Sequence, residues 1–372
     1  MEDRKIRVAI THGDTNGIGY EVIFKTFAEP AMLDLCTPVI YGSPKVAAYH
    51  RNALGIQANF TIINKVEDAV DGKVNLLPAF DDEVKVDMGV PTKEAGVAAL
   101  KALDRAMEDF AAGGYDVLVT APINKNDIQG DGFRFCGHTE YIQEKVGNGQ
   151  KALMILAGKR LRVALVTTHL PVKDIAGAIT TEAIVEKCTI FNDALKRDFN
   201  VSAPRIAVLS LNPHAGDGGV IGTEEETVIK PAIEQLSESG MDVFGPFAAD
   251  GFFGNGSYVA FDGVLAMYHD QGLAPFKTIV GGEGVNITAG LPIVRTSPDH
   301  GTAYDIAGKG IADETSFRQA VYDAIDIFRN RRNYDEPLQN PLKKLYHERR
   351  DDSEKVRFAV SKQKPKAPAE QK

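Results

Sequence analysis

Three histidines stand just past the ends of short apolar runs: His169 in VTTHLP, His214 in LSLNPHAGDGG and His269 in LAMYHDQG. If those runs are parallel strands of one sheet, the three imidazoles come to the same edge of it. Neutral imidazoles favour Zn²⁺, Co²⁺ or similar ions, and three protein ligands leave one position open for a substrate oxygen. The pattern predicts a metal site, with Asp270 as a hydrogen-bond partner of a ligand. The alternative is that each histidine is a packing residue.

Polar groups also follow the last apolar runs: Lys277 in APFK, Asn286 in VNIT and Arg295 in LPIVRTS. A lysine and an arginine near a metal would suit a doubly anionic substrate, since the arginine fork binds carboxylate or phosphate. His138 and Thr139, in GHTE, place an imidazole beside a hydroxyl at a predicted helix start. The alternatives are solvated surface cations and a helix cap.

Two glycine-rich segments could bind anions or a cofactor. The run at 212–219 precedes a T-x-x-E sequence at Thr223, and its backbone N–H groups could bind an anion or simply form a turn. The segment at 12–19 has glycines at 13, 17 and 19, which is not the G-x-G-x-x-G pattern of a dinucleotide site. The residues that bind a cofactor, and a preference for NAD or NADP, are therefore not predicted.

Short runs rich in valine and isoleucine are typical of strands buried on both faces. They lie at 7–10, 38–41, 60–63, 116–119, 152–155, 162–166, 205–209 and 263–267. Apolar residues at spacings of three and four predict helices over 92–110, after 223, and over 313–332. The alternation predicts an α/β fold with a largely parallel sheet and ligands beyond the carboxyl ends of its strands.

Composition excludes several classes of protein. The net charge of −9 has the wrong sign for binding nucleic acid or coating an anionic membrane, so an anionic substrate must be bound by a few local cations. Cys36, Cys136 and Cys188 are odd in number and lack C-x-x-C spacing, which argues against a disulfide framework or a thiolate zinc site. With no signal-peptide core or membrane span in the sequence, we expect a cytoplasmic protein.

The length of 372 residues suits one large α/β unit or two lobes that share a cleft. We expect residues 1–345 to form a single catalytic unit of two intertwined lobes with a central cleft. Residues 346–372 are rich in charged residues and proline, and they cannot bury enough apolar surface to become ordered. We expect this segment to be a disordered tail without a catalytic role.

Several long motifs occur in an order that resembles the 4-hydroxythreonine-4-phosphate dehydrogenase family of vitamin B6 (pyridoxal phosphate) biosynthesis. The resemblance covers about residues 6–330. Its motifs are GDTNGIG at 13–19, GHTE at 137–140, TTH at 167–169, LNPHAGDGG at 211–219, YHDQG at 268–272, VNIT with GLPI and RTS between 285 and 297, and DHGTAYDIAGKG at 299–310.

The resemblance implies NAD-dependent oxidation of the C3 hydroxyl of 4-phosphooxy-L-threonine. Loss of CO₂ from the resulting 3-oxo acid gives 3-amino-2-oxopropyl phosphate. It also implies a two-lobed fold similar to isocitrate and isopropylmalate dehydrogenases, with NAD or NADP bound without a Rossmann fingerprint. One divalent ion per site, Zn²⁺, Co²⁺ or Mg²⁺, would complete the chemistry.

By a residue-by-residue match, the resemblance assigns roles to eight positions. The metal ligands would be His169, His214 and His269, with His269 reaching across the interface of a homodimer. The substrate would contact the remaining five, which are His138, Thr139, Lys277, Asn286 and Arg295.

The base that takes the hydroxyl proton is a separate hypothesis. We favour Lys277, and Asp250 or a metal-bound water are the alternatives. The first motif reads GDTNGIGYE where family members commonly have GDPAGIGPE, so two prolines are missing and a less rigid loop is expected.

The same residues would also suit rival functions. They are a sister dehydrogenase for 4-phospho-D-threonate, 4-phospho-D-erythronate or an aromatic dihydrodiol, a non-redox metalloenzyme such as an aldolase or hydrolase, and a non-catalytic metal-binding protein.

Overall fold

The structure, a computed structural model, describes residues 4–80, 83–130, 134–135 and 137–341. Its strands are β1 (Ile6–Thr11), β2 (Cys36–Gly42), β3 (Phe60–Ile62), β4 (Val74–Pro78), β5 (Val117–Thr120), β6 (Leu153–Gly158), β7 (Leu161–Leu165), β8 (Arg205–Leu209), β9 (Asp242–Phe247), β10 (Gly263–Ala266), β11 (Val285–Ala289) and β12 (Arg295–Pro298).

The helices alternate with these strands over most of the chain. They are α1 (Gly19–Ala28), α2 (Pro30–Leu35), α3 (Pro44–Leu54), α4 (Lys93–Ala111), α5 (His138–Val146), α6 (Val172–Ala178), α7 (Thr181–Arg197), α8 (Lys230–Glu238), α9 (Ala249–Gly254), α10 (His269–Val280) and α11 (Thr315–Gln339). The α/β class predicted from the alternation is confirmed.

All eight apolar runs are strands, but four further strands, β4, β9, β11 and β12, were not predicted. Asn286 and Arg295 therefore lie within strands rather than after the last strand. The reason is their composition. β11 and β12 carry the buried polar residues Thr288, Arg295, Thr296 and Ser297, which interrupt any apolar run.

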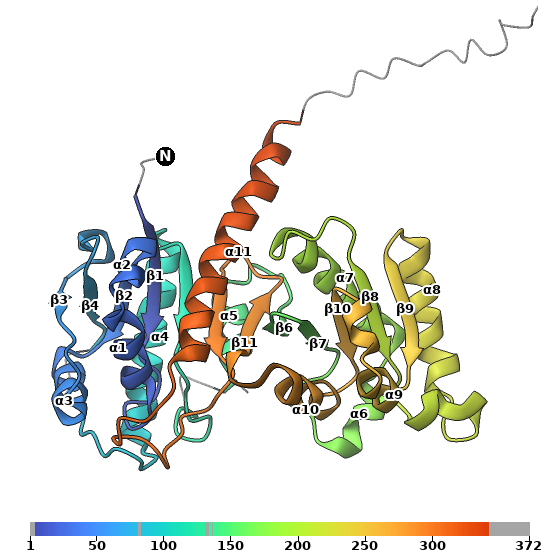
Figure 1. The fold of residues 1–372 in the computed structure, drawn as a ribbon, viewed down its shortest axis with the longest axis horizontal. Coiled ribbons are helices and arrows are strands. Elements are labelled where there is room, and N and C mark those ends of the chain that lie inside the picture. The colour runs from blue at the N-terminus through green and yellow to red at the C-terminus, as the bar shows by residue number, and fades with distance from the viewer. Residues whose placement is uncertain (1–3, 81–82, 131–133, 136, 342–372) are drawn as a thin grey trace, which may run out of the picture.

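The described residues form one twelve-stranded sheet in the order β3-β4-β2-β1-β5-β12-β11-β6-β7-β10-β8-β9. Figure 1 shows β3 and β4 at one end of the molecule and β9 with α8 at the other. The central strands β12, β11, β6 and β7 pair antiparallel in turn. These three reversals make the parallel group β7-β10-β8-β9 run opposite to the parallel group at the other end of the sheet.

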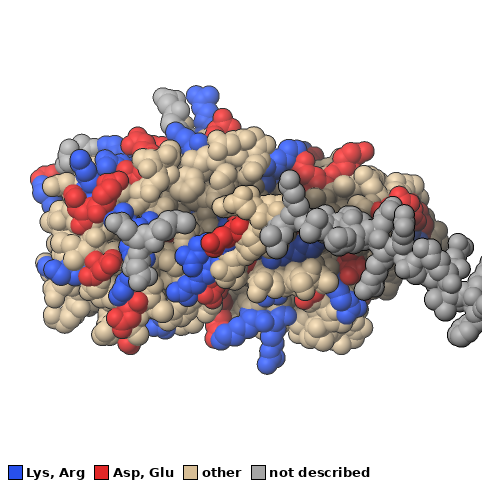
Figure 2. Space-filling model, turned by 90° about the horizontal axis from the view of Figure 1, so that it is seen from above, with Lys and Arg blue, Asp and Glu red and all other residues tan. Residues whose placement is uncertain are grey.

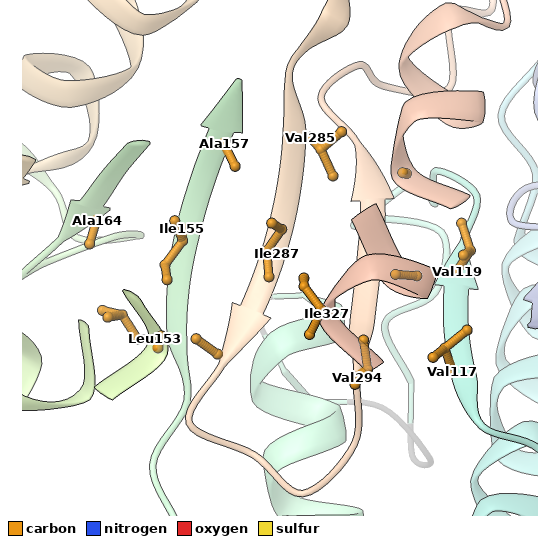
Figure 3. Packing of buried hydrophobic residues seen from close by; sticks show 14 of the residues in the cluster. Val117, Val119, Leu153, Ile155, Ala157, Ala164, Val285, Ile287, Val294 and Ile327 are labelled. Carbon is orange, nitrogen blue, oxygen red and sulfur yellow. The ribbon is translucent and has the colours of Figure 1, made fainter. Parts of the chain in front are cut away.

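The long helix α11 covers the middle of the sheet. It begins at Thr315 and ends at Gln339, so it is longer than the predicted segment 313–332. Figure 3 shows its Ile327 packed beside Ile287 of β11 and close to Val294 just before β12. The core is therefore continuous beneath the strands that separate the two parallel groups.

Helix α4 closely matches its predicted range, 92–110. It begins after Thr92, because the Thr92 side chain accepts a hydrogen bond from the Ala95 N–H and so caps the helix. Val97, however, is 50% exposed and does not belong to the buried face. That face consists mainly of alanines, together with Leu103 and Met107, which lets the helix pack closely on β1 and β2.

The loop after β1 is restrained although it lacks the two prolines. The Asn16 side chain donates to Val90 O (2.8 Å) and Thr92 Oγ1 (3.0 Å) and accepts from Asp87 N (2.9 Å). Its backbone N–H also donates to Asp14 Oδ1 (2.8 Å). These hydrogen bonds hold the loop against segment 87–92, so the expected loss of rigidity is offset.

The structure tests the expected domain boundary, the cysteines and the absence of a membrane span only in part. The predicted boundary at 345/346 falls among residues 342–372, outside the described residues, and the two-lobed arrangement of residues 1–345 stays a prediction. Cys36 and Cys188 are free and buried, and Cys136 also lies outside the described residues. Among the described helices, none is both long and apolar enough to cross a membrane.

The molecular surface carries charges of both signs. Figure 2 shows lysine and arginine side chains interspersed with aspartate and glutamate on one face of the described residues. This distribution agrees with the expectation that an anionic substrate is bound by a few local cations, so the position of individual cations becomes the relevant question.

His12, at the end of β1, is fully buried and its two ring nitrogens have no hydrogen-bond partner among the described residues. Burial, and secondly the nearby His50, lower the pKa of His12 from 6.5 to about 3. Below pH 6.5 the unfolded chain therefore takes up a proton that the folded chain does not. We expect the full unfolding free energy above pH 6.5 and a loss of up to about 1.4 kcal/mol per pH unit as the pH falls toward 3.

Urea unfolding of wild type and His12→Leu between pH 7.5 and pH 4 measures this effect. The variant is expected to lose less unfolding free energy over that range than wild type does. A residual slope is expected from His50, whose pKa is also lowered by burial. Identical slopes in the two proteins would contradict the assignment to His12.

Candidate active site

A cavity of about 210 Å³ lies at the middle of the sheet and is here called the central cavity. Five of the residues predicted from sequence line it, although they come from segments far apart in the chain. They are His138 and Thr139 at the start of α5, His169 after β7, Asn286 in β11 and Arg295 in β12. The folded sheet therefore assembles most of the predicted substrate site.

Arg295 is the buried cation of the central cavity and is 3% exposed. Its Nε and Nη2 donate to Thr120 Oγ1 (3.1 and 2.6 Å), and its Nη1 donates to Thr288 Oγ1 (3.2 Å). Within the described residues, no carboxylate forms an ion pair with it. Burial lowers the pKa of Arg295 to about 10, so the guanidinium remains charged at neutral pH. A buried charge with only hydroxyl partners favours binding of an anion.

Three further groups of the cavity, His138, Thr139 and Asn286, are neutral and able to form hydrogen bonds. Burial, then the Arg295 and Lys125 cations, hold the pKa of His138 well below its usual range, so its imidazole is neutral. Thr139 Oγ1 lies 3.4 Å from Thr288 Oγ1. The Asn286 Oδ1 atom is buried without a hydrogen-bond partner in the described structure. These groups can orient a polar ligand beside the cation.

His169 and His269 lie together, with their ring centroids 6.3 Å apart. His269 Nδ1 is 2.7 Å from Asp270 Oδ1, which confirms the predicted contact with Asp270. His169 Nδ1 is 3.4 Å from Glu140 Oε1. A carboxylate that holds Nδ1 directs Nε2 outward, as metal-ligating histidines require.

His214 belongs to a second cavity of about 520 Å³, here called the lateral cavity, which Asp250, Asp270 and Gln271 also line. His169, His214 and His269 follow β7, β8 and β10, which are adjacent and parallel, so their predicted common edge is confirmed. Nevertheless, no three histidine, cysteine, aspartate or glutamate side chains of the described residues lie close enough to hold a metal ion. Of the three predicted ligands, one chain thus brings His169 and His269 together.

The two candidate bases lie outside the central cavity of the same chain. Asp250 lines the lateral cavity. The half-exposed Lys277, on α10, has its Nζ 3.1 Å from Asp299 Oδ1 and donates to the Asp299 carbonyl at 3.1 Å. Burial raises the pKa of Asp299, and the Lys277 cation opposes that rise.

The glycine-rich segment at 212–219 lies next to a carboxylate of the chain itself. The backbone N–H groups of Leu211 and Asn212 both donate to Glu225 Oε1, at 2.8 and 2.7 Å. From His214 to Gly218 every residue has a positive φ, a conformation that the two glycines in this stretch adopt readily. The segment forms a tight turn that presents His214 to the lateral cavity.

Sequence reasoning did not assign three residues that line the central cavity: Lys125, Glu140 and His300. Lys125 follows the predicted strand at 116–119, so the rule that ligands lie beyond strand ends could have found it. Glu140 and His300 lie inside quoted motifs. The Glu140 Oε2 and His300 Nε2 atoms are both buried without a partner in the described structure.

Comparison with known proteins gives a consistent result. Residues 34–324 match the family described as "Pyridoxal phosphate biosynthetic protein PdxA". The chain is 61% identical, over 96% of its length and 98% of the relative, to a 4-hydroxythreonine-4-phosphate dehydrogenase of Bacteroides thetaiotaomicron. A protein of the same name from a Sulfurihydrogenibium species is 42% identical over 88% of this chain and 100% of that relative.

A solved structure of the same name, from Klebsiella pneumoniae, has the same fold. It superposes with a TM-score of 0.74 at 32% identity and covers 87% of this chain and 100% of its own.

Proposed function

This chain belongs to the PdxA family of pyridoxal phosphate biosynthesis, and from that membership we propose that it is a 4-hydroxythreonine-4-phosphate dehydrogenase. As an oxidoreductase it acts on 4-phosphooxy-L-threonine, whose C3 hydroxyl is oxidised. The 3-oxo acid then loses CO₂ and gives 3-amino-2-oxopropyl phosphate. The observation that carries this assignment is the 61% identity to a dehydrogenase of that name over 96% of the chain.

The central cavity supports the proposal, because its residues match the charges of such a substrate. Arg295 supplies a buried cation for the phosphate or the carboxylate. The neutral His138, Thr139 and the unpartnered Asn286 Oδ1 supply hydrogen-bond donors and acceptors for the remaining polar groups. Together they orient the substrate and limit the access of water to it.

A divalent metal ion fits the donors contributed by His169, His214 and His269. Asp270 and Glu140 hold the Nδ1 atoms of His269 and His169, so the Nε2 atoms are the ones that would bind the metal. Zn²⁺, Co²⁺ and Mg²⁺ are the candidates, and such an ion would stabilise negative charge on the substrate oxygen. We propose that the set of three is completed across a homodimer interface, with His269 supplied by the partner subunit, since a single chain does not bring all three histidines together.

The hydride of the C3–H bond would be accepted by NAD or NADP, and a base of the protein would take the hydroxyl proton. Lys277 is the proposed base. Since it lies outside the central cavity of its own chain, it would act at the cavity of the partner subunit, as His269 on the same helix would. Lys277→Met is expected to abolish turnover if this role is right, and retention of full turnover would exclude it.

The test follows NADH absorbance with metal-loaded protein, NAD and 4-phosphooxy-L-threonine. Parallel reactions contain 4-phospho-D-threonate or 4-phospho-D-erythronate, which replace the C2 amine by a hydroxyl. NADH formation with the amino acid alone supports the proposal. Turnover only with a sugar-acid phosphate would instead identify the protein as a dehydrogenase for that substrate. No turnover with any of the three compounds would favour a non-redox reaction.

A further inference from the structure

Lys125 is a second cation at the central cavity, and its segment is held firmly in place. It lies in the connection that follows β5. In that connection Asn124 Oδ1 accepts from Asn126 N (2.9 Å), and Asn124 Nδ2 donates to the Tyr304 hydroxyl (3.1 Å). The Tyr304 hydroxyl in turn donates to Asp14 Oδ2 (2.8 Å). The backbone on both sides of Lys125 is therefore fixed relative to the cavity.

Among the described residues, the ammonium group of Lys125 has one contact of hydrogen-bond length, to His169 Nε2 at 3.1 Å. No ion pair joins it to a carboxylate within the ranges 4–80, 83–130, 134–135 and 137–341. An ammonium has three N–H donors, so two remain available. The side chain is exposed at the rim of the cavity, where a ligand could reach it.

The balance of charge in the central cavity is positive. Among the residues that line it, Arg295 and Lys125 are cations, and Glu140 is the one carboxylate. Glu140 already faces His169 through Oε1 at 3.4 Å. Both cations also act on His138, since after burial they are the two further causes that lower the pKa of that imidazole. A substrate with one anionic group would leave one of the two cations without a counter-ion, and a substrate with two would neutralise both.

We propose that Lys125 is an additional anion-binding residue of the central cavity, which contacts His169 Nε2 in the ligand-free protein and an anionic group of the substrate in the complex. The inference rests on the proposed function and deepens it, because it adds a residue to the same site. Arg295 binds one anionic group deep in the cavity and Lys125 binds the other at its rim. The exchange also leaves His169 Nε2 available for another ligand.

The experiment compares Lys125→Met, which keeps the length of the side chain, with Lys125→Arg, which keeps the charge. The matched control is Lys93→Met, because Lys93 donates to Gln129 O at the far end of the same connection and does not line the cavity. Calorimetry measures the binding of inorganic phosphate and of malonate without NAD. Steady-state kinetics with 4-phosphooxy-L-threonine measures KM and kcat separately.

For Lys125→Met we expect KM to rise, and the affinity for at least one of the two anions to fall, by roughly ten- to a hundredfold. We expect kcat to change much less, Lys125→Arg to recover part of the affinity, and Lys93→Met to match wild type. Weakened binding of phosphate alone would place Lys125 at the phosphate group, and weakened binding of malonate alone would place it at the carboxylate.

The proposal is overturned if Lys125→Met binds both anions as wild type does and its KM is unchanged. Failure of the proposed function gives a different pattern. In that case wild-type protein forms no NADH from 4-phosphooxy-L-threonine, while anion binding still depends on Lys125. That result would mean that Lys125 does bind anions but that the substrate is a different anionic compound.

Discussion

Replacement of Arg295 by methionine is expected to lower kcat/KM for 4-phosphooxy-L-threonine by about two to three orders of magnitude. The reason is that Arg295 is the one cation buried in the central cavity, and its partners in the structure are hydroxyl groups rather than a carboxylate. An anionic group of the substrate therefore supplies its counter-charge. Methionine fills similar space but offers the substrate no charge and no donor.

Stability distinguishes this role from a structural one. A buried guanidinium without a carboxylate partner loses hydration on folding, so Arg295→Met is expected to leave Tm unchanged or raise it. The pKa of His138 is expected to rise in the variant, because Arg295 is one of the two cations that lower it. The control is Arg318→Met on α11, where Arg318 forms a half-buried ion pair with Glu314 outside both cavities. A variant at 295 that retains near wild-type kcat/KM would contradict the role.

Loss of a histidine of the metal site is expected to have an equally large effect. His169→Ala and His269→Ala are each expected to lower metal-dependent turnover by about three orders of magnitude. Both are also expected to lower the amount of metal bound per protomer, measured by elemental analysis after dialysis. Asp270→Asn, which weakens the support of His269, is expected to reduce metal affinity by roughly ten- to a hundredfold.

His12→Leu is the control for these variants, because it removes an imidazole that lies outside both cavities. Its metal content is expected to equal that of wild type. Full metal content in both His169→Ala and His269→Ala would contradict the assignment of these residues as ligands.

Mixed dimers test whether the site is shared between subunits. If His269 comes from the partner, co-refolded His169→Ala and His269→Ala chains should recover about a quarter of wild-type activity, because half of the dimers then carry one intact site. The alternative is that His169 and His269 of one chain bind the metal together and His214 comes from the partner. In that case the mixture of His169→Ala and His214→Ala chains recovers activity instead. Recovery in neither mixture would contradict a shared site.

Sequence reasoning located the chemistry better than it located the strands that carry it. His169, His214 and His269 follow predicted apolar strands, and their common edge was correct because parallel neighbours end together. Arg295 and Asn286 were identified as candidates but placed after the strands. Strands of mixed polarity give no apolar run, although a buried hydroxyl such as that of Thr288 accepts a hydrogen bond from Arg295.

Other features depend on contacts between distant segments and are not visible in a local pattern. Lys125 reaches His169 across 44 residues of sequence. Asn16 replaces the restraint of the missing prolines through contacts with segment 87–92, which the spacing of residues 12–19 does not reveal.

The most direct test of the central claim measures the products of a single reaction. Metal-stripped protein is incubated with NAD and 4-phosphooxy-L-threonine, before and after addition of Zn²⁺, Co²⁺ or Mg²⁺, and NADH and CO₂ are quantified together. Our account predicts no product from the stripped protein and equal amounts of NADH and CO₂ after metal is added. NADH formation that is unaffected by removal of the metal, or that releases no CO₂, would contradict it.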